Sequence, residues 1–435
     1  MADTAVFLSG LRASNDVNDA VERPKNFREA ILWLDPQGMT PLTAMSAKMK
    51  KETTDDPEFT WFEEVQDGKR ALINTFSNAP AGATTAGSLN TLTLDALTPS
   101  VTNPAFQYKV GDILMLFDQS VGEPSSYAGT GATAPELMRV DSITSGTILV
   151  VVRGYAGQAS PVTLIGGAVG TGDQVRLVGS AYAEGSTSAN GISGSPTKNT
   201  NYTQIFKSSF NQTNTAISTK YRTGDHFAND RKRAMFRHSE SLEMSALFGV
   251  FKEQTTGGGA TTVAGEPTRT AGGLRYFLST NQSVGVGAIS EDFFLDTLST
   301  LFNYNAGGAG DERIVMLGNG ALNAIQKVVR DGSGVRINYE GTVGFYGMNL
   351  LKYRIPQGTF FLKSHPLLNT DPVFRNSMFV LNGRGFIVRP LKGRDTKIQT
   401  NIQANDADQR KDQWLTETGW EVQFERTQGY YGGIL

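Results

Sequence analysis

The sequence contains no cysteine among its 435 residues and only three histidines. Disulfide bridges and thiolate metal sites are therefore excluded, and the composition suits a protein made and used in a reducing cytoplasm. Lys and Arg number 40 against 42 Asp and Glu, so the chain has no overall field that would gather nucleic acid or an anionic membrane. No run approaches the ~20 apolar residues of a membrane span. The residues after Met1 have neither a basic region nor a sustained apolar run, so we expect no signal peptide.

Proline is also absent from residues 202–251, where only two of the 48 glycines occur, Gly224 and Gly249. Asp225 is suited to cap a helix and Gly249 to end it. The pattern predicts one helix of about 24 residues, or ~36 Å at 1.5 Å per residue, in a chain that is otherwise short-segmented and β-like. Its inner face recurs at three- and four-residue steps, through Phe227, Ala234, Met235, His238, Leu242 and Ala246.

Residues 1–57 have isolated apolar side chains in a polar background, and Pro36, Gly38 and Pro41 interrupt any regular element. Such a segment buries little within itself, so we expect an arm that lies on another surface. Trp33 in the arm and Trp61 in the half-exposed segment after it are predicted to anchor contacts between subunits. The alternative is that each tryptophan packs within its own subunit.

Residues 79–175 form a distinct β-rich block, with short runs separated by clusters of Gly, Pro, Ser or Asp. The spacing predicts a small barrel or sandwich inserted into an extended hairpin. Residues 179–200, rich in Gly, Ser, Thr and Asn, are expected to be a flexible return from it. The expected strands are residues 92–94, 112–117, 137–140, 147–153 and 174–178.

The chain after the long helix mixes helices and strands. Ser290 is suited to cap a helix whose apolar residues, Phe294, Leu295, Leu298, Leu301 and Phe302, fall on one face. A second helix is expected at residues 321–329. Strands are expected at residues 313–317, 350–354, 359–362, 378–381, 385–390, 397–402 and 419–426.

No pattern in the chain is typical of an enzyme. His238 lies on the apolar face of the long helix, so we interpret it as a hydrogen-bonded packing residue. Glu63 and Glu64, like other adjacent carboxylates, point to opposite faces of a strand and do not form a glycosidase pair. The turn at residues 318–320 lacks the third glycine of a nucleotide-binding motif. We predict no catalytic residue, no cofactor and no metal site, although a site built from distant carboxylates stays open.

One dense basic cluster occurs on the long helix, at Arg231, Lys232, Arg233 and Arg237. Consecutive helical positions point around the axis, so the four do not form a single groove-reading face. We interpret the cluster as a solvated or subunit-bridging face. The alternative is weak, sequence-independent contact with packaged DNA, which would depend strongly on salt.

Four segments, in this order, support a family resemblance: DPQGMTPL at residues 35–42, GSAYAEG at 179–185, NYTQIF at 201–206 and TETGWEV at 416–422. With the order of the regions, they make the chain resemble the major capsid proteins of tailed bacteriophages, which have the HK97-type fold. The resemblance is closer to the subgroup with an extra domain in the extended loop.

The resemblance implies an α+β fold of six parts. They are an N-terminal arm (1–57), an extended loop (58–78 and 176–215), an inserted β-rich domain (79–175), a peripheral domain with a spine helix (216–289), an axial domain (290–380) and closing strands of the peripheral domain (381–435). Some relatives cross-link subunits through a lysine and an asparagine, but no residue here is matched to that pair.

The same resemblance implies the function. Hexamers and pentamers of the chain would assemble, in the host cytoplasm, into the icosahedral shell of a virion around double-stranded DNA. The implied partners are portal, scaffolding and decoration proteins and the packaged DNA, with no membrane. Two other readings stay open: a tail or baseplate protein that binds host surface glycans, and a carbohydrate-active enzyme, which would need a pocket of convergent carboxylates.

Overall fold

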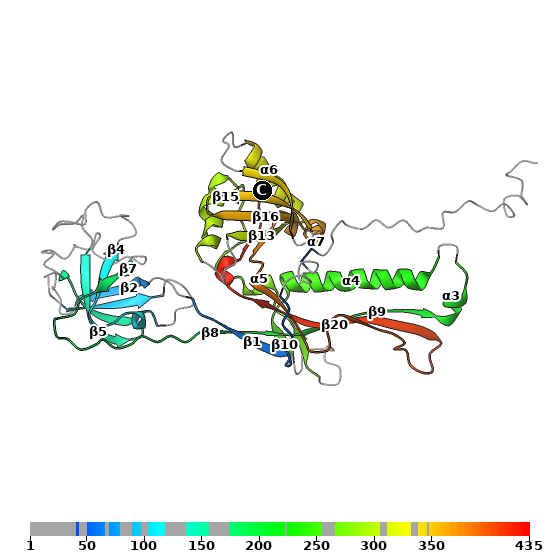
Figure 1. Cartoon of the computed structure of the whole chain (residues 1–435), viewed down its shortest axis with the longest axis horizontal. Helices are drawn as coiled ribbons and strands as arrows, with labels where there is room; N and C mark the ends of the chain where they lie inside the picture. Colours follow the sequence, from blue (N-terminus) through cyan, green and yellow to red (C-terminus); the bar gives the residue numbers. More distant parts are fainter. Residues whose placement is uncertain are drawn as a thin grey trace, which may run out of the picture. The chain divides into compact units, whose positions relative to one another are not determined.

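The structure is a computed structural model of the chain (Figure 1). It describes residues 41–42, 50–65, 69–78, 89–96, 103–117, 136–155, 174–221, 224–254, 266–304, 311–331, 338–345 and 348–435. The chain divides into two compact units, which we call the barrel unit (Phe62–Asn199) and the main unit (Met1–Trp61 and Thr200–Leu435).

The barrel unit contains a closed barrel of antiparallel strands. Their order around the barrel is β2 (Arg70–Asn78), β3 (Leu89–Asp95), β6 (Ile148–Val152), β5 (Glu136–Ser145), β4 (Asp112–Phe117) and β7 (Gln174–Ser180). The predicted β block is therefore a barrel, but a larger one than expected, because residues 70–78 form its first strand and were assigned to the extended loop. A short 3-10 turn, η1 (Pro104–Gln107), precedes β4. Alternate strand residues fill the core, including Ala71, Ile73, Leu92, Leu94, Leu114, Met138, Val140, Leu149, Val151 and Val175.

An ion pair lies buried in this barrel. The guanidinium of Arg153 donates to both carboxylate oxygens of Glu136, with Nε–Oε1 at 2.7 Å and Nη2–Oε2 at 2.6 Å. The two side chains are only 3% and 1% exposed. Glu136 is the first inward residue of β5, and Arg153 directly follows the end of β6, so the ion pair lies at this end of the two neighbouring strands.

The main unit contains the predicted long helix, α4 (His226–Phe248). The side chain of Asp225 accepts hydrogen bonds from the N–H groups of Phe227 and Ala228 at 2.9 and 3.2 Å, as the capping prediction requires. Gly249 ends the helix, and its N–H donates to the carbonyl of Ser245 at 2.9 Å. A Cβ at Gly249 would lie 2.3 Å from the carbonyl oxygen of Ala271, so a glycine is needed where this backbone passes so close.

The inner face of α4 packs on a four-stranded antiparallel sheet, and in Figure 1 the helix runs alongside β9 and β20. The long strand β20 (Gln409–Val422) is central, with β9 (Gln204–Thr213) on one side and β18 (Phe386–Pro390) and β19 (Lys397–Gln399) on the other. β20 ends earlier than the expected strand at 419–426, because Phe424 adopts a left-handed conformation (φ 55°) before the turn η7 (Glu425–Thr427).

A second sheet of the main unit has seven strands. Their order is β12 (Gln282–Ser283), β21 (Gly429–Tyr431), β17 (Met378–Leu381), β13 (Glu312–Leu317), β16 (Gly358–Ser364), β15 (Met348–Ile355) and β14 (Asn338–Phe345). β13 runs parallel to β16 and antiparallel to β17. The end of the chain therefore returns to the strands of the expected axial domain, whereas residues 381–435 were all assigned to the peripheral domain.

The helix expected after Ser290 is irregular. The segment forms a π-helical turn, η4 (Phe293–Thr297), followed by a 3-10 turn, η5 (Leu298–Phe302), and neither has a side-chain cap. Phe294, Leu298 and Leu301 are buried as predicted, but Leu295 is 38% exposed, because the changed turn geometry rotates it out of the face.

Short elements complete the described chain. They are β1 (Glu58–Glu63), which pairs with β8 (Thr197–Tyr202), β10 (Lys252–Gln254), which pairs with β11 (Thr268–Thr270), and the helices α3 (Asn214–Ser218), α5 (Leu274–Phe277), α6 (Asn319–Asp331), α7 (Pro366–Thr370) and η6 (Phe374–Asn376). No helix in the described part of the chain has the length and apolar character that a membrane crossing requires.

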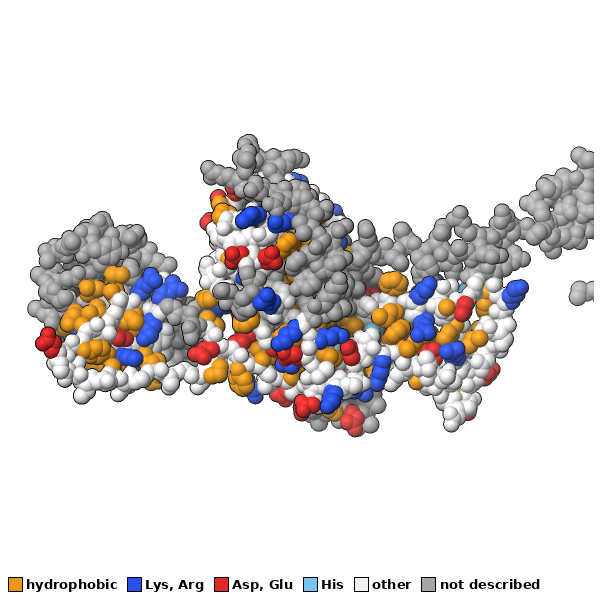
Figure 2. Space-filling view, viewed as in Figure 1, with side chains coloured by type: hydrophobic (Ala, Val, Ile, Leu, Met, Phe, Trp, Pro, Cys, Tyr) orange, Lys and Arg blue, Asp and Glu red, His pale blue; other side chains and the backbone are white. Residues whose placement is uncertain are grey.

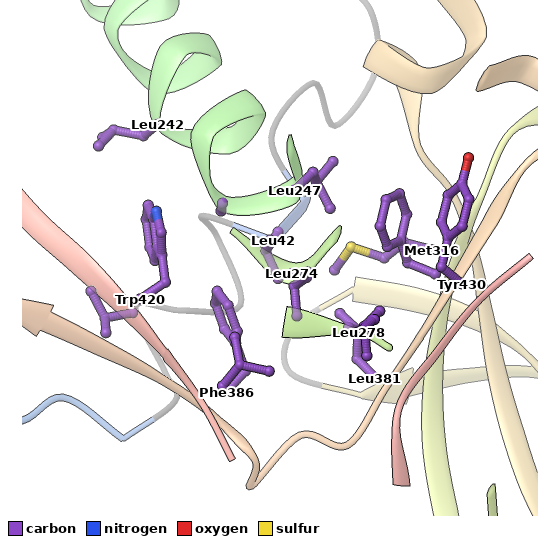
Figure 3. Packing of buried hydrophobic residues seen from close by; sticks show 14 of the residues in the cluster. Leu42, Leu242, Leu247, Leu274, Leu278, Met316, Leu381, Phe386, Trp420 and Tyr430 are labelled. Atoms are coloured by element: carbon purple, nitrogen blue, oxygen red, sulfur yellow. The ribbon is translucent and has the colours of Figure 1, made fainter. Parts of the chain in front are cut away.

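The largest core of the main unit joins α4 to both sheets. Figure 3 shows Leu247 of α4, Trp420 of β20 and Met316 of β13 around α5. Leu42, from the predicted arm, is fully buried in this same cluster. At least one residue of the arm is thus part of its own subunit's core.

Candidate functional site

The last residues of the predicted arm, 50–57, are named the arm root here. The arm root lies along the outer edge of β18 as a short parallel addition to the four-stranded sheet. The N–H of Glu52 donates a hydrogen bond to the carbonyl oxygen of Val388 at 3.1 Å. The N–H of Lys392 donates one to the carbonyl oxygen of Thr54 at 2.8 Å. These bonds satisfy the edge of β18, which would otherwise be open to another strand.

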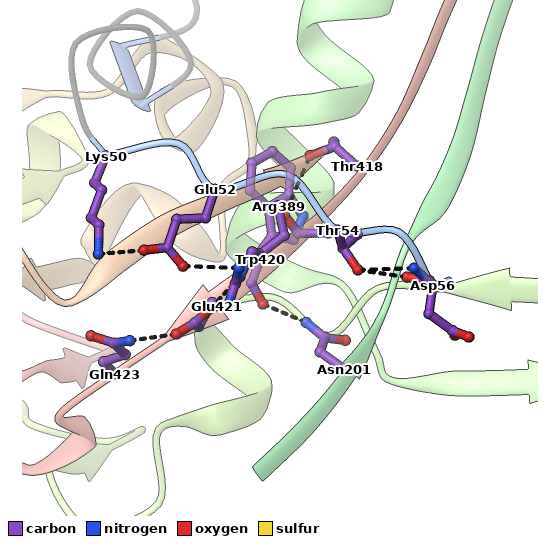
Figure 4. Close-up of polar contacts among 11 residues, drawn as sticks. Lys50, Glu52, Thr54, Asp56, Asn201, Arg389, Thr418, Trp420, Glu421 and Gln423 are labelled. Carbon is purple, nitrogen blue, oxygen red and sulfur yellow. Dashed lines mark hydrogen bonds and ion pairs between the residues drawn. The ribbon is translucent and has the colours of Figure 1, made fainter. Parts of the chain in front are cut away.

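Charged side chains reinforce this attachment (Figure 4). Arg389 of β18 binds two carboxylates, Glu52 of the arm root at 2.9 Å and the buried Glu421 of β20. Glu52 also pairs with Lys50. Because Arg389 has a carboxylate on either side, it bridges the arm root to the centre of the sheet.

Hydrogen bonds and nearby charges favour the ionised forms of two carboxyl groups at this attachment, those of Glu52 and Asp395. The hydrogen bond from Lys50 lowers the pKa of Glu52, with Arg389 adding to the effect against partial burial. Burial acts to raise the pKa of Asp395, but the hydrogen bonds from Lys51 and from the backbone of Thr396 outweigh it, so this pKa is also lowered. Lys51 and Asp395 lie 2.9 Å apart and are 43% and 49% exposed, so their pair contributes little free energy on its own.

The structure describes one of the two tryptophans that the sequence predicts as anchors between subunits. Trp61 is 5% exposed, because it packs on Phe59 of the same strand at 6.2 Å and edge-on to Phe277 of α5 at 5.4 Å. These partners belong to its own chain, which favours packing within the subunit, and the role of Trp61 as an anchor between subunits stays a prediction. Trp33 lies outside the described residues.

The basic cluster lies in the first half of α4, and all four of its side chains are exposed. Arg231 lies over the ring of Trp414 at 5.8 Å, and Arg233 pairs with Asp230 at 3.4 Å. Figure 2 shows Lys and Arg side chains spread over the part of the main unit that carries α4. The side chains thus spread around the helix, as the sequence predicts, and do not converge on one point.

His238 is fully buried between α4 and the sheet, where it hydrogen-bonds Ser208 and Thr416. This is the packing role expected from its place on the apolar face. In the described part of the chain, no group of three or more His, Asp or Glu side chains is arranged to hold a metal ion.

The sequence analysis missed the residues that attach the arm root. Arg389 and Glu421 each stand in an otherwise apolar strand run, FIVRP and TGWEV. A charged residue inside a buried strand needs a partner, and that pattern was the signal available. That pattern does not identify the partner of Arg389 in the arm root, Glu52, which lies more than 300 positions away in the chain.

A family model described as the SU10 major capsid protein matches residues 9–434. The chain belongs to the SU10 major capsid protein family. It is 22% identical to the major capsid protein of Pseudomonas phage PaMx41 over 383 residues, which make up 86% of this chain and 80% of that protein.

Solved structures with a related chain path include the capsid of an empty GTA particle. That chain is 8% identical, with a TM-score of 0.46, and the match covers 98% of this chain and 100% of the other. The capsid chain of Microbacterium phage Oxtober96 is 8% identical, with a TM-score of 0.42, and the match covers 95% and 97%.

This member of the SU10 family is thus a phage major capsid protein that forms a shell, and the predicted function is confirmed. The predicted α+β class is confirmed as well, with a long helix, antiparallel and mixed sheets and a small closed β-barrel. No finding supports the tail or baseplate reading. Membership of the subgroup with an inserted domain stays a prediction.

Proposed function

We propose that copies of this chain, as hexamers and pentamers, form an icosahedral shell around the double-stranded DNA of a tailed phage. The observation that carries the proposal is the family match, which spans residues 9–434 and so includes the arm, the barrel and both sheets. If the function of the chain is to contact other copies of itself, and not to catalyse a reaction, the arm, the barrel and both sheets can all contribute to that one function.

Assembly in the host cytoplasm, around a scaffolding protein and a portal and with decoration proteins outside, is part of the same proposal. The absence of cysteine supports assembly in the cytoplasm, since a shell without disulfide bridges needs no oxidising compartment.

The test is to express the chain and image the product of size-exclusion chromatography by negative-stain electron microscopy. Closed shells or curved sheets are expected. Discrete rings or trimers would contradict the proposal, as would a chain that stays monomeric both alone and with the phage's own scaffolding protein.

For the basic cluster on α4 we propose weak contact with the packaged DNA. Its support is the exposure of all four side chains together with their spread around the helix, which suits phosphates more than base edges. Binding of random-sequence duplex DNA should fall with salt, with a slope of about −0.9 per phosphate contact in a logarithmic plot.

The matched experiment uses two charge reversals. The Lys232→Glu/Arg237→Glu variant should show a shallower salt slope and weaker binding. The control, Lys392→Glu/Lys397→Glu, changes two exposed lysines near β18 and β19 and should bind as the wild type does. Equal losses in both variants would contradict a role for the cluster and leave the shell proposal untouched.

A further inference from the structure

A carboxylate of α4 joins three distant segments of the main unit. Oε1 of Glu243 accepts hydrogen bonds from the N–H of Leu42, at 2.7 Å, and from Nε2 of His365, at 2.8 Å. These partners are 201 and 122 positions away in the chain. Leu42 belongs to the arm, and His365 stands between β16 and α7. Local helix formation therefore cannot explain why a glutamate occupies this position.

Glu243 is buried together with both of these partners. Glu243, His365 and Leu42 are all 0% exposed. Figure 3 shows Leu42 beside Leu247 near the end of α4, within the core cluster. A carboxylate in such a place is costly unless donors surround it, and the donors from Leu42 and His365 help to offset that cost.

The dependence is mutual. Because Oε1 is an acceptor, Nε2 of His365 carries the proton of this hydrogen bond, and Nδ1 has no hydrogen-bond partner among the described residues. The buried N–H of Leu42 likewise needs an acceptor. Removing the carboxylate would leave both donors buried without the group they share.

This attachment differs in chemistry from that of the arm root. The root is held by backbone pairing and by ion pairs that are partly exposed to solvent, such as Lys51 with Asp395. Glu243 holds the chain at one buried point through a charged acceptor. The two attachments lie on either side of residues 43–49, so each can be tested by itself.

We propose that Glu243 is a latch that holds the arm at Leu42 against α4, and that opening the latch releases the arm while the sheets stay folded. The consequence of the latch for contacts with other copies rests on the proposed shell function, but the latch itself does not.

The absence of cysteine makes a direct test available, since one introduced thiol is unique in the chain. A Leu42→Cys reporter becomes labelled by a soluble thiol reagent only when the arm leaves its pocket. A Val380→Cys reporter, fully buried in β17, becomes labelled only on wider unfolding. Each reporter is combined with Glu243→Gln, which keeps the size of the side chain and removes its charge. The matched control is Glu240→Gln, a partly exposed glutamate on the same helix.

In the Glu243→Gln background the Leu42→Cys thiol should label about tenfold faster or more, the effect of weakening a charge-assisted buried hydrogen bond. The Val380→Cys thiol and both Glu240→Gln proteins should keep their wild-type rates. Unchanged labelling at position 42, or equal acceleration at both reporters, would overturn the latch. Fast labelling of Leu42→Cys with Glu243 intact would also overturn it. None of these results depends on whether shells form.

Discussion

His238 of α4 and Thr416 of β20 form a buried hydrogen bond, with Nε2 and Oγ1 2.7 Å apart. The other ring nitrogen lies 3.2 Å from Ser208 Oγ of β9. One imidazole thus joins the spine helix to both strands beneath it. Because the ring is fully buried, its charged form is disfavoured, and burial lowers the pKa of His238 below the ordinary value of 6.5.

A pH dependence of stability follows from this shift. Since the folded-state pKa is below the unfolded one, the unfolded state binds more protons as the pH falls through 6.5. The contribution of His238 is fully present above that pH and is lost as the pH falls toward the folded-state pKa. Urea unfolding should therefore show a lower midpoint at about pH 5.5 than at about pH 7.5.

Tryptophan fluorescence is a clean readout, because all four tryptophans of the sequence lie outside the barrel unit. The His238→Gln variant should be less stable than the wild type by about 1–3 kcal/mol at the higher pH. The gap between the two proteins should narrow as the pH falls. Parallel pH curves would show that His238 does not contribute to the dependence.

The ion pair of the barrel unit makes a second prediction. Glu136→Ala removes the carboxylate and leaves the Arg153 guanidinium buried without it, so the barrel should lose about 3–5 kcal/mol. Amide hydrogen exchange in β5 and β6 measures this loss, and tryptophan unfolding of the main unit should not change. The double variant Glu136→Leu/Arg153→Met should recover most of the protection, because apolar side chains of similar volume replace a buried pair well. Protection equal to the wild type in Glu136→Ala would contradict the prediction.

A third prediction concerns the end of α4. Replacing a glycine by alanine usually stabilises a compatible site by about 0.4–1 kcal/mol. At Gly249 the new Cβ would meet two backbone oxygens, those of Ala271 at 2.3 Å and Ser245 at 2.5 Å, and backbone cannot give way cheaply. We expect Gly249→Ala to destabilise the main unit by about 1–3 kcal/mol. Gly285→Ala is the control, because nothing lies within 4 Å of its Cβ, and its midpoint should match or slightly exceed that of the wild type.

The sequence predicted best what short-range signals determine. Asp225 and Gly249 mark the ends of α4 to within a residue, because a cap and a stop act on their own backbone neighbours. The turn residues between them predicted the later strands of the barrel. The first strand, β2, was assigned to the extended loop instead, because it follows β1 after only a few residues and the two were interpreted as one segment.

Contacts between distant segments were not predictable in the same way. The edge of β18 offers no local mark of the arm root that covers it, and Glu243 appears in the sequence as one more charged residue of a helix. Its partners Leu42 and His365 are defined only by the packed fold. The pattern of buried charge shows that a partner must exist, and three-dimensional structure alone identifies it.

Trp61 and its neighbour Phe62 provide the last prediction, because adjacent residues of β1 differ sharply in exposure, 5% against 64%. Trp61→Ala removes contacts with Phe59 and Phe277 and should destabilise the subunit by about 3–5 kcal/mol, as buried aromatic truncations do. Phe62→Ala should leave the unfolding free energy within about 0.5 kcal/mol of the wild type. Chemical unfolding followed by the remaining tryptophans measures both. If Trp61→Ala kept wild-type stability while shells failed to form, Trp61 would act between subunits after all, and the burial of its ring in a single chain would not represent its role.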